Sequence, residues 1–316
     1  MGPVKCWSSL NGTWHEGDVP GAVVRWFDAT GDDGGLEELA TRFGLHPLAV
    51  EDCRSPLLHA PKIDEFPDHL FIVLLAAITP ASDNPTEVAV EELDVFLGRD
   101  FLITYQDRRV DEVDKVEHAI ATGLAIRPGA DGLLYELADR VVDSTLPQVN
   151  SIAERLEAIE ADVLRRPDGP AHSHGIVALR AQAGRIRRLL GPQLLVMQRL
   201  SRGEFTFVAE SNRIYFRDIY DHMVRLDMAL EGVRDDAEVV LSTYLSSLNN
   251  RMNEVMKVLS VVAALALPAT VIAGIFGTNF DNVPALHTDW GFATMIGAMA
   301  GVMLGMAYYF HRRGWF

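Results

Sequence analysis

The last quarter of the chain constrains the fold most, because two long stretches there carry no formal charge. The first covers the 23 residues 258–280 and the second the 21 residues 290–310. An α-helix rises about 1.5 Å per residue, so either stretch can cross a hydrocarbon core of roughly 30 Å. The sequence therefore predicts two transmembrane helices, over 257–280 and 290–310.

The charges around these stretches predict their orientation. The connecting loop, 281–289, contains Asp281 and Asp289 but no Lys or Arg, whereas basic residues flank the pair on its other side. By the positive-inside rule both ends of the hairpin are cytoplasmic and the acidic loop is outside. The N-terminus shows no apolar export segment, which predicts that the N-terminal part stays in the cytoplasm. We expect a multi-pass protein of a bacterial-type inner (plasma) membrane.

The charge balance narrows the function. The chain holds 28 basic and 44 acidic residues, and the first 256 residues hold 25 against 42, since three basic and two acidic residues lie beyond them. Such a surface repels nucleic acid and attracts cations. We find no P-loop, GxSxG or nucleotide fingerprint, so we expect no enzyme and no nucleotide partner. The lipid bilayer and divalent cations are the expected partners.

Residues 1–125 predict a cytosolic α/β domain. Strand patterns cover 22–30 and 69–79, a hairpin fits 92–106, and a short amphipathic helix fits 36–45.

The sequence predicts a cytosolic helical hairpin and stalk over residues 126–256. Its last helix runs without a breaker into the first span, over some 60 residues, and a helix so long must pack in a bundle or an oligomer. Residues 311–316 form a basic cytosolic tail.

Three local predictions concern the helical part. Pro147 lies inside the stretch 132–164, where we expect a kinked helix. The Pro- and Gly-rich segment 165–175 predicts a break, and His172 and His174 are interpreted as residues of a solvent-exposed loop. The basic residues after this break are expected to pair with the acidic helix before it, and they are Arg180, Arg185, Arg187 and Arg188.

A polar and small-residue stripe follows the first span at helical spacing. Steps of three or four keep these residues near one face, and they are Asn253, Met256, Ser260, Ala263, Leu267, Thr270, Gly274 and Gly277. Two spans cannot enclose a pore, but several copies around an axis would line one with this face. A small-residue helix interface explains the same pattern and remains an alternative. At the outer end, Gly277, Thr278 and Asn279 offer neutral oxygens suited to a hydrated cation.

Several segments resemble the CorA family of divalent-cation transporters in the family's own order. They include RWFDATG, FGLHPLAVEDC, PKIDEFPDHLFIVL, YFRDIYDHMVRL, the long segment from YLSSLNN to NVPAL, and the terminal RRGWF. The resemblance covers nearly the whole chain. It implies a funnel-shaped homopentamer, with an α/β domain at its wide end, a long stalk helix that continues into a pore-lining first span, and an outer second span.

The resemblance also implies roles for individual residues. The implied pore-lining residues are Asn253, Met256, Leu259, Ala263, Leu267 and Thr270. The implied selectivity ring is Gly277, Thr278 and Asn279, with Asp281 and Asp289 at the outer mouth and Arg312 and Arg313 as a cytoplasmic basic ring. Asp52 and Asp218 match a pair of acids that bind regulatory metal between subunits. No resident cofactor is implied beyond the transported and regulatory cation, Mg²⁺ or Zn²⁺.

The chain departs from the family signature GMN at its middle position, where Thr278 stands. A zinc-transporting branch, ZntB-like and thought to couple to protons, also departs there. Three functions therefore stay open. The first is a channel or transporter that carries Mg²⁺ or Zn²⁺, with Co²⁺ or Ni²⁺ as further ions, down the electrochemical gradient. The second is a proton-coupled Zn²⁺ transporter, and the third is a membrane-anchored metal sensor or interaction protein with a non-conducting pore.

Overall fold

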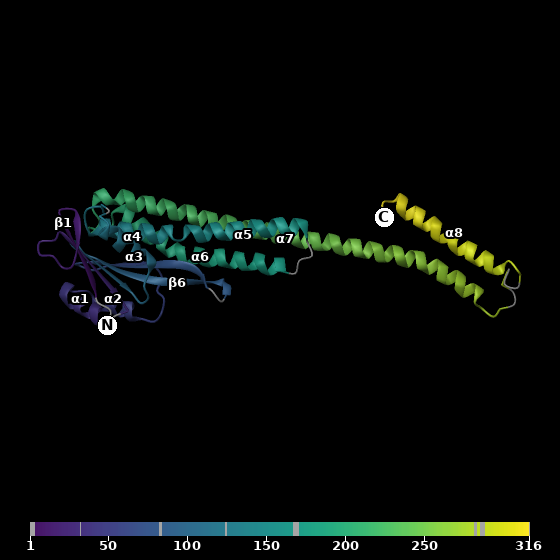
Figure 1. Ribbon diagram of the computed structural model, residues 1–316, viewed down its shortest axis with the longest axis horizontal. Coiled ribbons are helices and arrows are strands. Elements are labelled where there is room, and N and C mark those ends of the chain that lie inside the picture. Colours follow the sequence, from purple (N-terminus) through teal and green to yellow (C-terminus); the bar gives the residue numbers. More distant parts are fainter. Residues whose placement is uncertain are drawn as a thin grey trace. The chain divides into compact units, whose positions relative to one another are not determined.

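The computed structural model describes residues 4–31, 33–81, 84–123, 125–166, 171–280, 283–284 and 288–315. The chain divides into two compact units, Met1–Leu241 and Ser242–Phe316. The first unit contains a sheet and the helices packed on it, and the second contains two apolar helical segments (Figure 1). The predicted α/β stretch and most of the predicted helical stretch thus share the first unit.

In the described residues the first unit is built on a seven-stranded sheet with the order β2-β1-β3-β7-β6-β5-β4. Only the β3–β7 pair among these is parallel. The predicted strands and the hairpin turn at Gly98 are confirmed, and β1, β2 and β4 are additional. The strands are β1 (Lys5–Leu10), β2 (Thr13–Glu16), β3 (Val24–Thr30), β4 (Lys62–Glu65), β5 (Leu70–Ala81), β6 (Asn84–Leu97) and β7 (Phe101–Gln106).

Helices cover both faces of this sheet, so its central strands are buried on both sides. One face packs against α1 (Asp33–Phe43) and α2 (Pro47–Arg54), through side chains such as Phe71 and Phe96. The other face contacts α4 (Ala130–Asp143) and α6 (Ala171–Arg202). Gly44 ends α1 with a φ of 63°, which confirms the predicted helix stop.

The remaining helices are α3 (Asp111–Ala121), α5 (Leu146–Arg165), α7 (Glu210–Phe276) and α8 (Gly291–Arg312). Helix α7 is continuous over 67 residues, which confirms the predicted stalk helix and its extension into the first apolar stretch. It passes the boundary between the two units without an interruption. Its first part buries Phe216, Ile219 and Met223 in the first unit.

Three helical predictions were wrong. Pro147 does not kink one helix: α4 ends at Asp143, and Pro147 lies in the first turn of α5, where its missing N–H has no helical partner to lose. His172 and His174 lie in the first turns of α6 rather than in a loop. Arg180 and Arg187 pair with acids of α7 and not with α5, because α7 also borders α6 and presents Asp227 and Glu238 there.

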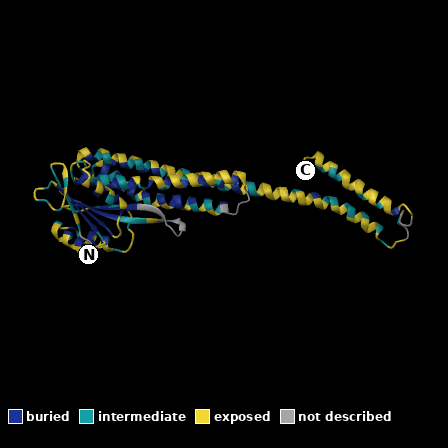
Figure 2. Ribbon diagram, in the orientation of Figure 1, coloured by how far each residue is buried: buried dark blue, intermediate teal, exposed yellow. Residues whose placement is uncertain are grey.

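The second unit is a helical hairpin. In the part of the chain that the structure describes, α7 and α8 are long and apolar enough to cross a membrane. Only 6% of the most apolar 18-residue segment of each helix is buried. Most residues of this hairpin are exposed (Figure 2). The Lys257 ammonium donates to the Gly314 carbonyl at 3.0 Å, so the far end of α8 returns to the level where the uncharged stretch of α7 begins.

Candidate ion path and acidic sites

The predicted stripe and the implied pore-lining residues share an exposed face of α7. The pore-lining residues are all exposed in the single chain, and they are Asn253, Met256, Leu259, Ala263, Leu267 and Thr270. By contrast Val261 is 2% exposed, and Ala264, Leu265 and Pro268 are partly covered. These covered positions fall on a different face of the helix. The stripe is therefore free to face an axis shared with other copies, which stays a prediction.

The hydroxyl groups along this part of α7 are tied to the helix backbone. Thr270 Oγ1 donates to the Ala266 carbonyl at 2.9 Å, and Ser260 Oγ donates to the Met256 carbonyl at 2.7 Å. A hydroxyl that donates in this way still has lone pairs that accept a hydrogen bond from an ion's water. Pro268 has no N–H, so the helix leaves the Ala264 carbonyl without its usual donor.

The Gly277-Thr278-Asn279 segment begins where α7 ends. The Gly277 N–H donates to the Ala273 carbonyl at 2.9 Å, and Thr278 Oγ1 turns back to the Ile275 carbonyl at 2.8 Å. A Cβ on Gly277 would meet the Ala273 oxygen at 3.2 Å, so this close turn favours glycine. Thr278 thus closes the helix end, and Asn279 follows it with an exposed side chain.

The remaining predicted mouth residues are placed in part. Asp281 lies outside the described residues, while Asp289 is exposed beside the start of α8.

The two arginines of the predicted basic ring lie at the end of α8. Arg312 is the last residue of α8 rather than part of a tail, and Arg313 caps that helix. The Arg313 guanidinium lies 5.6 Å from the centre of the Tyr309 ring. Both arginines are exposed at the end of the hairpin that also holds Lys257.

Asp52 lies near the end of α2 and already has a cationic partner. Its Oδ2 is 2.7 Å from Lys62 Nζ, and its Oδ1 is 4.0 Å from His59 Nε2. Lys62 is shared with Asp64, also at 2.7 Å. A metal at Asp52 would therefore have to compete with a tethered ammonium group.

Asp218 lies on α7 in a more acidic setting. Its side chain is 60% exposed and its Oδ2 is 3.9 Å from His222 Nε2. Asp139 of α4 has a raised pKa, because it is half-buried and because the negative charges of Asp143, Glu136 and Asp218 act on it. Glu136, Asp139 and Asp143 of α4 are spaced three and four residues apart, which places them near one face of the helix. This spacing is visible in the sequence, and we did not use it. Within one chain Asp52 and Asp218 have different partners, and their pairing between subunits stays a prediction.

An α/β unit, a helix of 67 residues and a pair of helices long and apolar enough to cross a membrane together indicate a membrane protein. The family profile described as CorA-like Mg²⁺ transporter protein matches residues 21–312. The chain belongs to this CorA family of divalent-cation transporters.

The relatives agree with this family. The chain is 31% identical to the putative metal ion transporter YfjQ of Bacillus subtilis, over 95% of this chain and 92% of that protein. It is also 31% identical to the cobalt/magnesium transport protein CorA of Thermotoga maritima, over 89% and 79%. The zinc transport protein ZntB of Cronobacter sakazakii matches at 23%, over 87% and 83%.

The fold agrees as well. The structure of the CorA magnesium transporter from Methanocaldococcus jannaschii superposes with a TM-score of 0.86 at 20% identity. The match covers 100% of this chain and 99% of that one. At this identity the likeness defines the fold, and it confirms the predicted order of α/β domain, long helix and two apolar C-terminal helices.

Proposed function

We propose that this chain forms a homopentameric channel for Mg²⁺ or Zn²⁺, with Co²⁺ and Ni²⁺ as further ions, in a bacterial-type inner membrane. One observation supports it above the others: α7 runs unbroken from an acidic α/β unit into an apolar segment whose polar stripe is uncovered in one chain. Copies arranged around this stripe would give hydrated cations a path between them. Both chain ends would be cytoplasmic.

In this proposal the ion loses little of its water. Asn279 and the backbone around Gly277 form the outer ring, and Met256, Leu259 and Leu267 form hydrophobic constrictions that close by dewetting. Asp281 and Asp289 raise the local cation concentration at the outer mouth, and the basic ring of Arg312 and Arg313 lies at the cytoplasmic end. Cations bound at Asp52 and Asp218 between subunits hold the pore closed when the internal concentration is high.

Ion flux tests this function directly. Purified protein in liposomes is assayed for Mg²⁺ and Zn²⁺ uptake with fluorescent indicators, with and without a proton gradient. We expect flux above that of empty vesicles, and at least a tenfold loss in Asn279→Ala. Stimulation of Zn²⁺ uptake by an inward proton gradient supports the ZntB-like alternative. The absence of flux for every cation supports the sensor with a non-conducting pore.

A matched pair of substitutions tests the proposed pore-lining face. Leu259→Ser introduces a hydroxyl at a proposed constriction and is expected to raise flux severalfold by wetting it. Val262→Ser makes a similar change at an exposed position off the stripe, and it is expected to leave flux near the starting value. Equal effects of the two substitutions would contradict the assignment of the pore face.

The regulatory pair is tested by proteolysis. Asp218→Ala is expected to weaken the protection that Mg²⁺ gives the cytosolic part against trypsin, while Asp235→Ala, on the same helix, serves as the control. An unchanged digestion profile for Asp218→Ala would count against a regulatory metal at this residue.

A further inference from the structure

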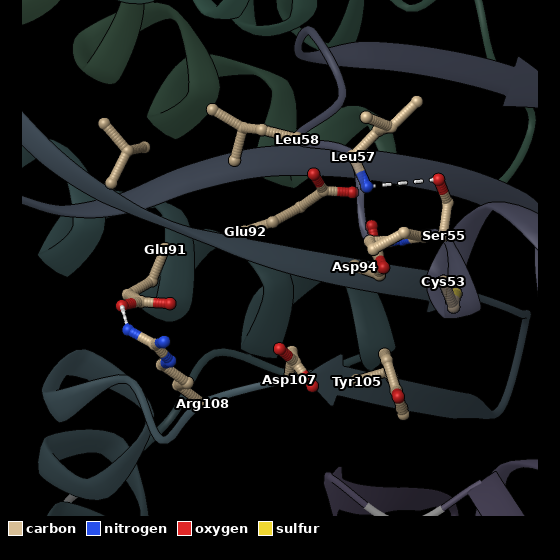
Figure 3. A pocket seen from close by; sticks show the side chains of 12 residues that line it. Cys53, Ser55, Leu57, Leu58, Glu91, Glu92, Asp94, Tyr105, Asp107 and Arg108 are labelled. Atoms are coloured by element: carbon tan, nitrogen blue, oxygen red, sulfur yellow. Dashed lines mark hydrogen bonds and ion pairs between the residues drawn. The ribbon is translucent and has the colours of Figure 1, made fainter.

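A pocket of about 250 Å³ opens on the sheet face that α2 covers, and it is strongly acidic. Four carboxylate residues line it, together with one cationic residue, Arg108. The acids are Glu91, Glu92, Asp94 and Asp107. Figure 3 shows Asp94 between Glu92 and the end of α2, with Arg108 turned toward Glu91 at the rim.

Asp94 is the buried group of this pocket. It is 3% exposed, and its Oδ1 has no hydrogen-bond partner in the described structure. The Cys53 thiol lies next to the same carboxyl group. Burial raises the pKa of Asp94 well above its usual range, and the neighbouring Glu92 raises it further. A buried carboxyl oxygen that lacks a donor is satisfied either by a proton or by a cation that takes the proton's place.

Glu92 adds a second carboxylate that is held in place. It stands two residues before Asp94 on β6, so both side chains project from the same face of the strand. The His59 backbone N–H donates to Glu92 Oε2 at 2.6 Å, and His59 Nδ1 is 3.0 Å from Oε1. The pocket thus contains two neighbouring carboxylates, one of them oriented by fixed contacts and the other incompletely partnered.

Two neighbouring carboxylates in a water-accessible pocket suit a cation that keeps most of its water. In the part of the chain that the structure describes, no three His, Cys, Asp or Glu side chains are arranged to clasp a metal ion directly. Zn²⁺ sites are usually built from three or four Cys, His or carboxylate ligands. Mg²⁺ keeps several waters and needs one or two carboxylates. Six waters at roughly 30 Å³ each occupy about 180 Å³, which the pocket can hold.

We propose that the Glu92–Asp94 pocket binds a hydrated divalent cation of the Mg²⁺ type, one per chain, at a site separate from Asp52 and Asp218. The site lies within a single subunit, so it needs no neighbouring copy. His59 links the pocket to the end of α2. Its Nδ1 is 3.0 Å from Glu92 Oε1, and its Nε2 is 4.0 Å from Asp52 Oδ1.

Binding of Mn²⁺, a Mg²⁺ surrogate, to the full-length protein in detergent tests the site by electron paramagnetic resonance of the free ion. We use the Asp52→Asn/Asp218→Asn background to remove the predicted intersubunit sites. We expect this protein to retain about one Mn²⁺ per chain, displaced by Mg²⁺. A pore ion shared among copies would contribute less than one ion per chain.

Two changes should remove this ion. Asp94→Asn/Glu92→Gln is expected to weaken Mn²⁺ binding at least tenfold, whereas Asp100→Asn, in the exposed turn of the same hairpin, should not. Leu58→Arg changes a half-exposed lining residue and places a tethered cation in the pocket, so it should also displace Mn²⁺. The proposal is overturned if the background protein binds no Mn²⁺, or if both pocket variants bind it like the background. Flux plays no part in this readout.

Discussion

Two buried aspartates of the same sheet differ in how their charge is compensated. Asp28 accepts from Thr104 Oγ1 at 2.7 Å and Gln106 Nε2 at 3.0 Å, and its other oxygen is 3.2 Å from Arg109 Nη1. Asp94, on the opposite face, has an oxygen without a partner. The difference indicates that Asp28 belongs to a completed structural network, whereas Asp94 stands in a pocket that is complete only with a bound cation or a proton.

The largest expected effect separates these two residues by stability. Asp28→Asn points an amide N–H₂ at existing donors and deprives Arg109 of a buried partner, so we expect a loss of about 3 kcal/mol. Asp94→Asn removes a buried carboxylate whose Oδ1 lacks a donor, so we expect a change within about 1 kcal/mol at pH 7. Thermal unfolding by circular dichroism measures both. Equal losses would erase the distinction.

The next effect is a pH dependence. Burial, opposed in part by Thr104 and Arg109, raises the pKa of Asp28, and burial with Glu92 raises that of Asp94 much further. A carboxyl group with a raised folded-state pKa stabilises the protein below its unfolded pKa, about 4, and that contribution is lost as pH rises through the folded pKa. In metal-free buffer we expect the unfolding temperature to fall with rising pH above about 5.

Asp94→Asn should remove most of this slope, since the asparagine side chain does not titrate. A slope that survives unchanged in Asp94→Asn would assign the titration to other groups. Added Mg²⁺ should also flatten the slope in the unsubstituted protein, because a bound cation favours the ionised carboxylate.

A smaller effect concerns the thiol next to Asp94. Burial and the charges of Asp94, Glu92 and Asp52 raise the pKa of Cys53, and burial raises that of Cys6 less strongly. Because the thiolate is the nucleophile, Cys53 should react with iodoacetamide at pH 8 at least tenfold more slowly than Cys6. Peptide mass spectrometry of the native protein measures both rates. Comparable rates would mean that the pocket opens readily.

The smallest effect is expected at the rim of the pocket. The Glu91 carboxylate lies 3.7 Å from Arg108, whose side chain is 78% exposed. Solvent-exposed ion pairs contribute little, so Glu91→Gln should change stability by less than about 0.5 kcal/mol. The Glu91→Gln variant should also lose less Mn²⁺ affinity than the Asp94→Asn variant. A larger effect of Glu91→Gln would move the proposed cation toward the rim.

The sequence by itself determined the features that depend on neighbouring residues. The two uncharged stretches, the unbroken helix before them and the alternation around Gly98 follow from local hydropathy and turn chemistry. The resemblance to the CorA family rested on residues in sequence order, and the family profile and relatives confirm it. The roles of the pore, mouth and regulatory residues stay predictions, because one chain does not contain the axis or the intersubunit joint.

Tertiary structure decided everything that depends on which segments become neighbours. The basic face of α6 had acidic segments on both sides in sequence, and only packing showed that Arg187 pairs with Asp227 of α7. Asp94 appeared in sequence as one polar residue within an apolar strand. Its contact with Cys53 arises because the end of α2 lies beside this part of β6, and no pattern along the strand encodes that contact.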